Sequence, residues 1–206
     1  GLDIKNPFSG IYMNRDDGVQ KRLPIPNKTI ITVHEECRRM NDDIRWLIGL
    51  ISDTGLRLSE ATGLAIDDIV LDDEIPHLII QPYPWRRLKT KGSHRTIPLV
   101  GFSLWSAKQI KKNNTCQYAF PRYIPNNECL SNSASASVNK WLKTFIPKEC
   151  SVHSFRHSMR DRLRAVECPK EIIDQIGGWS SGDVGESYGE GFPLINLSEW
   201  LNKVSM

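Results

Sequence analysis

The side chains best suited to chemistry gather near the end of the sequence, between His153 and Tyr188. Four of them share one face of an expected helix because they fall at positions i, i+3, i+4 and i+7. They are His153, Arg156, His157 and Arg160. Another face carries an apolar stripe that should pack on the core, formed by Val152, Phe155, Met159, Leu163 and Val166. Guanidinium forks beside protonatable imidazoles suit an anion such as a phosphodiester.

Two other interpretations of this basic face stay open. It is also what an ordinary solvated helix surface looks like. In addition, His153 and His157 have the i, i+4 spacing of a zinc pair. We favour an anion over a metal because no glutamate lies between the histidines and the neighbouring arginines would repel a dication. We therefore expect no metal ligands and no other cofactor.

Tyr188 lies nine residues after Trp179, in a segment rich in glycine. The glycines there are at positions 177, 178, 182, 185, 189 and 191. Such a backbone can move and offers a tyrosine ring little to pack against locally, which suits a nucleophilic phenol. A simple surface loop would have the same composition.

Two further basic features come earlier in the chain. Arg57 follows Gly55 at the end of an apolar helix, a place where a surface arginine is common. A basic hairpin then carries five cations in ten positions: Arg86, Arg87, Lys89, Lys91 and Arg95. Such a hairpin either protects a sheet edge by charge or reaches a phosphate and sugar in a DNA groove.

The order of these motifs resembles the tyrosine recombinase family, the phage and transposon integrases. The matching stretches are "TGLRLSEATGL" at 54–64, "KTKGSHRTIPL" at 89–99, "HSFRH" at 153–157 and "GGWSSGDVGESYG" at 177–189. The resemblance covers roughly residues 30–200 and implies the catalytic domain of that family. Each motif is weak alone, and their shared order gives the resemblance its strength.

The resemblance implies a role for each matching residue. Arg57 and Arg156 would bind the non-bridging oxygens of the scissile phosphate. Tyr188 would attack phosphorus, forming a 3′-phosphotyrosyl link and freeing a 5′-hydroxyl. His153 would act as general base for the phenol.

The remaining assignments also follow from the resemblance. A lysine would protonate the departing 5′-oxygen, and we favour Lys89 over Lys91. Trp179 stands where most members have histidine; its indole N–H can bind a phosphate oxygen but cannot transfer a proton. Glu60 would support Arg57 or its helix rather than do chemistry. The expected contacts to DNA outside the reacting phosphate are Arg86, Arg87, Lys91, Arg95, His157 and Arg160.

The implied function is that of a tyrosine-type site-specific recombinase, a phage or genomic-island integrase that cleaves and rejoins DNA. Two alternatives are a type IB topoisomerase-like relaxing enzyme and a non-catalytic DNA-binding accessory module. The intact catalytic set argues against the second alternative, because binding alone needs no phenol. The implied partner is double-stranded DNA at attachment sites, with a homotetramer on DNA, a monomer alone and DNA-bending accessory proteins as further expectations.

The amino-acid composition is compatible with a DNA recombinase but does not by itself indicate one. The chain has 206 residues and a net charge of only +3, and this net charge by itself does not indicate a nucleic-acid-binding protein. Its five cysteines are scattered and odd in number, which argues against a disulfide framework and fits the reducing cytoplasm of a bacterial host cell. No apolar run approaches the ~18 to 20 residues of a membrane span, and no secretory signal opens the sequence.

The elements that must position these residues point to an α+β fold, mainly α-helical with one small three-stranded antiparallel sheet. Residues 1–29 are expected to be an arm or linker and 30–206 a catalytic domain without the family's N-terminal DNA-binding domain. The expected helices are Thr32 to Met40, a second from about Asn41 to a cap at Gly55, a short one around Glu60, and 102–112, 133–145, 152–166, 169–177 and 195–204; the strands lie within 69–99. The last helix would pack either on a neighbouring protomer or on its own domain.

Overall fold

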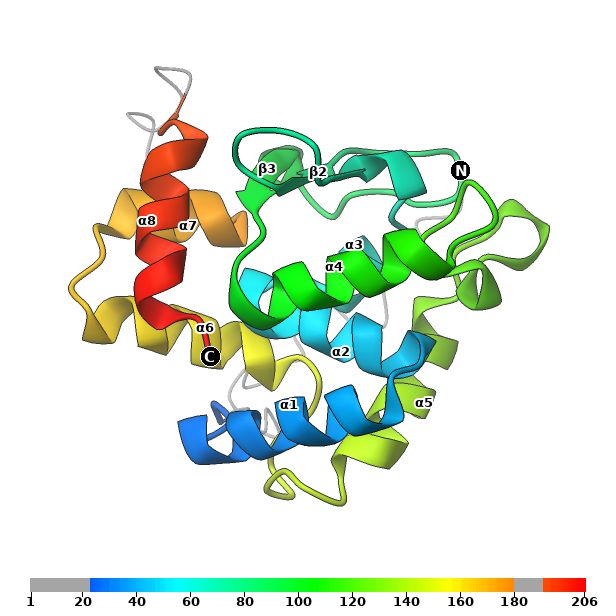
Figure 1. Cartoon of the computed structure of the whole chain (residues 1–206), viewed down its shortest axis with the longest axis horizontal. Coiled ribbons are helices and arrows are strands. Elements are labelled where there is room, and N and C mark those ends of the chain that lie inside the picture. Colours follow the sequence, from blue (N-terminus) through cyan, green and yellow to red (C-terminus); the bar gives the residue numbers. More distant parts are fainter. Residues whose placement is uncertain (1–22, 180–190) are drawn as a thin grey trace, which may run out of the picture.

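The computed structural model describes residues 23–179 and 191–206. Helices dominate this part of the chain, and a small sheet lies at one end of it (Figure 1). The helices are α1 (Asn27–Met40), α2 (Asp43–Thr54), α3 (Leu58–Thr62), α4 (Gly101–Asn113), α5 (Ser131–Leu142), α6 (Ser154–Ala165), α7 (Lys170–Gly177) and α8 (Leu194–Val204). The strands are β1 (Ile69–Val70), β2 (His77–Ile80) and β3 (Arg95–Pro98), and short 3-10 turns are η1 (Ile66–Asp68), η2 (Lys91–Ser93), η3 (Pro121–Tyr123) and η4 (Pro125–Asn127). The predicted fold class is confirmed.

The sheet is antiparallel, with strand order β1-β2-β3. Leu78 in the central strand pairs with Ile69 on one side and Ile97 on the other. All three side chains are buried, so the sheet turns an apolar face to the core. β3 also contacts α7 and α8, which ties the sheet to the C-terminal helices. In Figure 1, α6 lies beneath these two helices.

Helix α2 is the centre of the core. It contacts α1, α3, α4, α5, α6 and α8. Its residues Leu47, Ile48, Leu50 and Ile51 are all buried, as expected for a helix that is apolar on several faces. Helices α3 and α6, which carry or adjoin the candidate residues Arg57 and Arg156, therefore both pack on α2.

The ends of the first two helices show which local signals the sequence carried. Gly55 caps α2 in the left-handed conformation, with φ 64°, and donates its N–H to Ile51 O, as predicted. The predicted start of the first helix at Thr32 is wrong, because α1 already begins at Asn27, directly after Pro26. The Thr32 hydroxyl lies inside the helix and donates to Lys28 O instead of capping.

Helix α8 packs on its own domain. It contacts α6, α2 and β3, and buries Leu197 and Leu201. Arg162 of α6 donates from Nη1 to Val204 O at 2.7 Å and pairs with the buried carboxylate of Asp53 at 3.0 Å. These contacts lie within one chain, and packing of the C-terminal helix on a neighbouring protomer stays a prediction.

Two further expectations concern the chain as a whole. All five cysteines are described, and none forms a disulfide. Among residues 23–179 and 191–206, no helix is long and apolar enough to cross a membrane. Most of the expected N-terminal arm lies outside the described residues; within its last part, Ile25 is buried and bonded through its N–H to Ser158 Oγ.

Candidate active site

The turn that follows α2 brings the two predicted phosphate-binding arginines together. Gly55 ends α2, and Arg57 follows it as the N-cap of α3. Arg156 lies in the first turn of α6 and donates from Nη1 to the carbonyl of Gly55 at 2.6 Å. The same three-residue turn thus carries one arginine and accepts a hydrogen bond from the other.

Arg57 is held on three sides. Its Nη1 donates to Glu60 Oε1 at 2.6 Å and to Ser93 Oγ at 3.1 Å, and its Nη2 donates to Gly178 O at 3.1 Å. Glu60 also accepts the backbone N–H of Arg57 at 3.0 Å through Oε2. The prediction that Glu60 supports Arg57 is therefore confirmed by the geometry, and the guanidinium arrives at the site already oriented.

Arg95 belongs to this cluster and not to a hairpin tip. Its side chain is buried, with Nη2 donating to Glu60 Oε2 at 2.9 Å, Nη1 to Ser93 O at 2.7 Å and Nε to Ile176 O at 2.9 Å. Arg95 was expected to contact DNA, and that expectation stays a prediction; in the structure β3 turns this side chain inward toward Glu60. Arg95 instead joins β3 to α3 and to the end of α7.

Arg86 is buried in the same way. It is 3% exposed and donates to the carbonyls of Glu60 and Gln81, with the Asp68 carboxylate 3.9 Å away. These bonds hold the β2–β3 connection against α3, and a contact of Arg86 with DNA stays a prediction. Arg87 and Lys89 are exposed on that connection and remain available to a partner. The side chain of Lys91 lies outside what the structure describes.

Arg156 has more positive charge around it than negative. It is 3% exposed, and its Nη2 is buried with no hydrogen-bond partner among the described residues. Burial, followed by the nearby Arg57 and Arg95, lowers the pKa of Arg156 to about 9. An anion bound here would satisfy the orphaned N–H group and offset the repulsion.

Glu60 is the carboxylate that faces these three cations. Burial raises the pKa of Glu60, but Arg95 and Arg57 outweigh burial, so that its pKa lies below the ordinary value. Glu60 is therefore ionised at neutral pH and neutralises one charge of the three. The remaining excess positive charge suits an anion.

Trp179 covers this site from the side of α7. Its ring lies 4.2 Å from the guanidinium carbon of Arg156 and 5.1 Å from that of Arg160, both within range of a cation–π contact. The ring folds back over Gly177, where an added Cβ would meet it at 1.8 Å. Gly178 supplies the left-handed turn with φ 60°. The Gly-Gly-Trp sequence is thus required by the stacking of Trp179 on the two arginines.

The two histidines of the basic face also lie together. The rings of His153 and His157 are 5.2 Å apart, edge to face, and both side chains are half-buried. Within the described ranges, no three His, Cys, Asp or Glu side chains come close enough to hold a metal ion.

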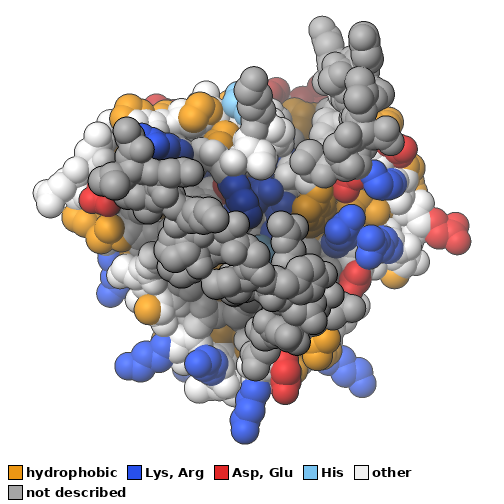
Figure 2. Space-filling model, turned by 180° about the vertical axis from the view of Figure 1, so that it is seen from behind, with side chains coloured by type: hydrophobic (Ala, Val, Ile, Leu, Met, Phe, Trp, Pro, Cys, Tyr) orange, Lys and Arg blue, Asp and Glu red, His pale blue; other side chains and the backbone are white. Residues whose placement is uncertain are grey.

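On the side of the molecule opposite to the view of Figure 1, lysine and arginine side chains gather near the centre of the face (Figure 2).

Tyr188, the predicted nucleophile, lies outside the described residues. Both flanks of that interval are attached to α7. On the first flank, Trp179 donates its backbone N–H to Asp174 O at 3.0 Å. On the second, the side-chain amide of Gln175 donates to Phe192 O at 3.0 Å and accepts from Phe192 N–H at 2.8 Å.

Sequence reasoning missed Ser93 and Gln175, whose side chains organise the site. Both are polar residues in predicted turns or helix ends, where a bonded and an unbonded side chain look alike in sequence.

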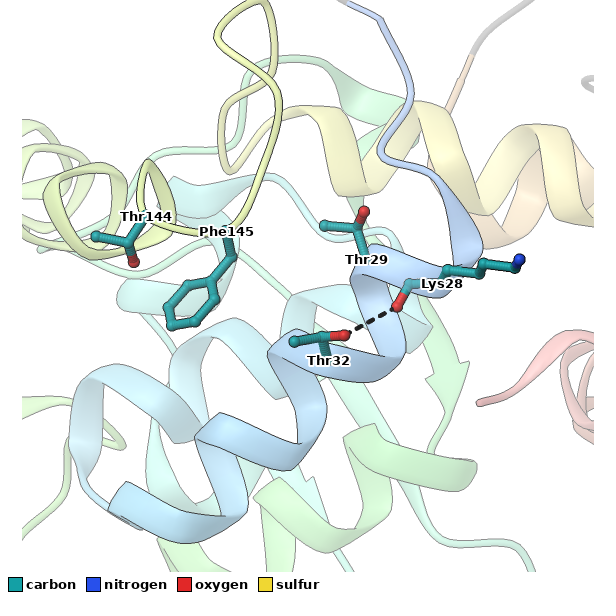
Figure 3. A pocket seen from close by; sticks show the side chains of 5 residues that line it. All are labelled: Lys28, Thr29, Thr32, Thr144 and Phe145. Carbon is teal, nitrogen blue, oxygen red and sulfur yellow. Dashed lines mark hydrogen bonds between the residues drawn. The ribbon is translucent and has the colours of Figure 1, made fainter.

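A cavity of about 310 Å³ lies away from this site, between α1 and the segment after α5 (Figure 3). It is lined by Lys28, Thr29, Thr32, Thr144 and Phe145, and we assign it no function.

The mainly helical fold with a small sheet, and the arginine cluster between α3 and α6, define a protein of the tyrosine recombinase class. Residues 27–190 match the family described as the phage integrase family. The chain belongs to this family. A comparison with curated proteins found no match.

Solved structures of recombinases share the fold. The Tn1549 transposon integrase in complex with circular intermediate DNA superposes with a TM-score of 0.58 at 18% identity, covering 89% of this chain and 66% of that one. The XerH site-specific recombinase bound to a palindromic difH substrate gives 0.54 at 17% identity, covering 84% of this chain and 50% of that one. This chain therefore spans between half and about two thirds of these solved chains.

Proposed function

We propose that this chain is the catalytic part of a site-specific DNA recombinase, an integrase of a phage or genomic island. It would cleave and rejoin DNA through a 3′-phosphotyrosyl intermediate. The observation that carries the proposal is the orphaned Nη2 of Arg156, buried beside Arg57 and Arg95. A scissile phosphate is the anion that such a cluster suits in a member of this family.

The arginines would stabilise the charge that develops during phosphoryl transfer. Arg57 and Arg156 would each donate to a non-bridging oxygen, and Arg95 would add a third positive charge through Glu60 and Ser93 without contacting the phosphate. Fixed donors of this kind are effective because they need no reorganisation when the transition state forms. Trp179 would hold Arg156 by stacking and offer its indole N–H to the phosphate.

The remaining groups would move protons. The phenol of Tyr188, with an ordinary pKa of about 10, would lose its proton to His153 as its oxygen bonds to phosphorus. The P–O5′ bond would break, and Lys89 or Lys91 would protonate the leaving oxygen. The phosphotyrosine would conserve the bond energy for rejoining, so that neither a metal nor a nucleotide is required.

Double-stranded DNA at an attachment site would be the partner. Arg87, His157 and Arg160 are at least partly exposed and are the candidates for contacts outside the reacting phosphate. Both solved relatives described above were determined with DNA bound. We further propose a tetramer on DNA and a monomer without it, with DNA-bending proteins as accessories.

A nicked suicide substrate tests the proposal, because loss of the short 5′-ended strand traps the covalent adduct. With a substrate carrying the attachment core site, the parent protein should form an adduct that persists in EDTA, and Tyr188→Phe should form none. Tyr118→Phe is the matched control, since its hydroxyl donates to Asn127 on an exposed turn away from the arginine cluster. An adduct in Tyr188→Phe equal to that of the parent would rule out the assigned nucleophile, and a strict metal requirement would revive a zinc site at the two histidines.

A further inference from the structure

Ser93 is a hydrogen-bond junction between the basic hairpin and the arginine cluster. The residue is fully buried at the end of η2. Its Oγ accepts from Arg57 Nη1 at 3.1 Å and lies 2.9 Å from Thr90 Oγ1. Its backbone N–H donates to Thr90 O at 3.1 Å, and its carbonyl accepts from Arg95 Nη1 at 2.7 Å.

The chemistry of the hydroxyl explains why this position connects two segments. A serine hydroxyl has one proton to donate and two lone pairs, whereas a guanidinium can only donate. The Ser93 oxygen therefore accepts from Arg57 and still has capacity for a bond with the hydroxyl of Thr90. One buried atom thus ties the hairpin to an arginine proposed to hold the phosphate.

The hydrogen bond between Ser93 and Thr90 is relevant to catalysis because of the position of Thr90 in the sequence. Thr90 lies between Lys89 and Lys91, the two candidates for the general acid. Fixing Thr90 through both its hydroxyl and its carbonyl fixes the backbone from which either lysine extends. The consequence is the same whichever lysine delivers the proton.

We propose that Ser93 is a positioning residue that sets the general-acid lysine relative to the phosphate held by Arg57. This inference rests on the proposed function and adds a residue to it. Ser93 touches neither the phosphate nor the leaving oxygen. Its loss would therefore impair protonation of the 5′-oxygen, while Glu60 and Gly178 continue to hold Arg57.

The test compares two suicide substrates, one with the ordinary 5′-oxygen and one with sulfur in its place at the scissile bond. A thiolate leaves without protonation, so the second substrate does not need the general acid. We expect Ser93→Ala to form adduct roughly ten- to hundredfold more slowly on the oxygen substrate, the loss for a hydrogen bond to a charged network. On the sulfur substrate it should react at the parent rate.

Three variants sharpen the comparison. Thr90→Val removes the partner hydroxyl from an exposed side chain and should reproduce the Ser93→Ala result, including when Ser93→Ala itself fails to fold. Thr90→Ser keeps the hydroxyl and should behave as the parent. Ser106→Ala is the control for a buried serine, because Ser106 Oγ has no hydrogen-bond partner in the described structure and should leave both rates unchanged.

The outcomes separate this inference from the proposed function. Equal slowing of Ser93→Ala on both substrates would overturn the inference, because Ser93 would then act through phosphate binding. Parent rates for Ser93→Ala and Thr90→Val on the oxygen substrate would overturn it as well. If the parent protein forms no adduct on either substrate, the proposed function itself fails.

Discussion

Burial of Arg156 beside two other cations costs free energy in the protein without DNA. The guanidinium loses water, and one of its nitrogens gains no partner among the described residues in exchange. Arg57 and Arg95 add repulsion that Glu60 offsets only in part. A site held in this unfavourable state binds a phosphate more strongly than a neutralised site would, since the anion removes both costs.

Replacing Arg156 should reduce cleavage far more than it reduces DNA binding, because many contacts share the binding of DNA whereas the extra charge of the transition state develops on this one phosphate. We expect Arg156→Ala to lower the rate of adduct formation by roughly 10²- to 10³-fold, as for loss of one transition-state donor. Arg156→Lys keeps the charge but loses the fork, and should recover only part of the rate. Arg122→Ala is the control, because that arginine pairs with Asp43 at the surface; equal losses for the two alanine variants would contradict the assignment.

His34 supplies a prediction about pH at the residue scale. Burial, followed by Arg162 and Arg38, lowers the pKa of His34 to about 3. The neutral ring is the form that fits the fold, where it stacks on Phe102 at 3.9 Å and bonds to Ser52 at 2.7 Å. Because the unfolded chain binds a proton near pH 6.5 and the folded protein does not, stability is lost as pH falls from about 6.5 toward 3.

The expected size is about 2 kcal/mol of unfolding free energy between pH 7 and pH 5 from this one histidine. Urea titrations at the two pH values measure it. His34→Gln should be less stable at pH 7, and its loss between the two pH values should be smaller than that of the parent by this amount. An unchanged difference would show that His34 is protonated in the folded protein.

At the scale of elements, the turn at Gly55 connects helix packing to the site. Its φ of 64° is one that side chains other than glycine adopt at a cost, and an added Cβ would meet Met159 Cγ at 3.2 Å. We expect Gly55→Ala to lower the free energy of unfolding by about 1–2 kcal/mol. It should also slow cleavage, because Gly55 O holds Arg156.

Gly92→Ala is the control for that substitution. An added Cβ there meets no atom within 4 Å, so unfolding should change little. Chemical denaturation of both variants measures the difference. A Gly55→Ala protein as stable as Gly92→Ala would contradict the strain that we assign to the turn.

Local signals predicted the elements well. Gly55 was recognisable as a cap because a glycine ends an apolar period, and the stripe from Phe155 to Leu163 predicted the buried face of α6. The start of α1 was missed because Thr32 and Pro26 both resemble helix starts, and burial of Ile25 favours the earlier one.

The site was predictable only where residue type alone determines the role. Arg57 and Arg156 were expected to lie together, and they do. The burial of Arg86 and Arg95 was not predictable, because their acceptors are far away in sequence. A basic hairpin and a set of buried arginines have the same composition, and only tertiary contacts distinguish them.

At the scale of the whole molecule, the net positive charge is small, but positive side chains are concentrated in one cluster. The net charge is +3, yet three guanidinium groups meet around one carboxylate. DNA binding by this chain alone should therefore be weak and should fall steeply with salt, with a log–log slope near −0.9 for each phosphate contacted. Fluorescence anisotropy between about 50 and 200 mM salt measures the slope.

The double substitution of Arg87 and Lys89 by alanine should reduce the magnitude of that slope by about 2, because both exposed side chains are expected to contact phosphates. Substituting Lys111 and Lys112 at the end of α4 is the control for a change of the same net charge. An equal change of slope in both double variants would show that binding follows total charge and not the hairpin.

The central claim is that a phosphate held by Arg57 and Arg156 is attacked by Tyr188. Mass spectrometry of the trapped adduct, after digestion of protein and DNA, tests it most directly. The account predicts a nucleotide joined through its 3′-phosphate to the peptide that contains Tyr188, with a free 5′-hydroxyl on the released strand. A nucleotide joined to another residue, or a 5′-phosphate linkage, would contradict it.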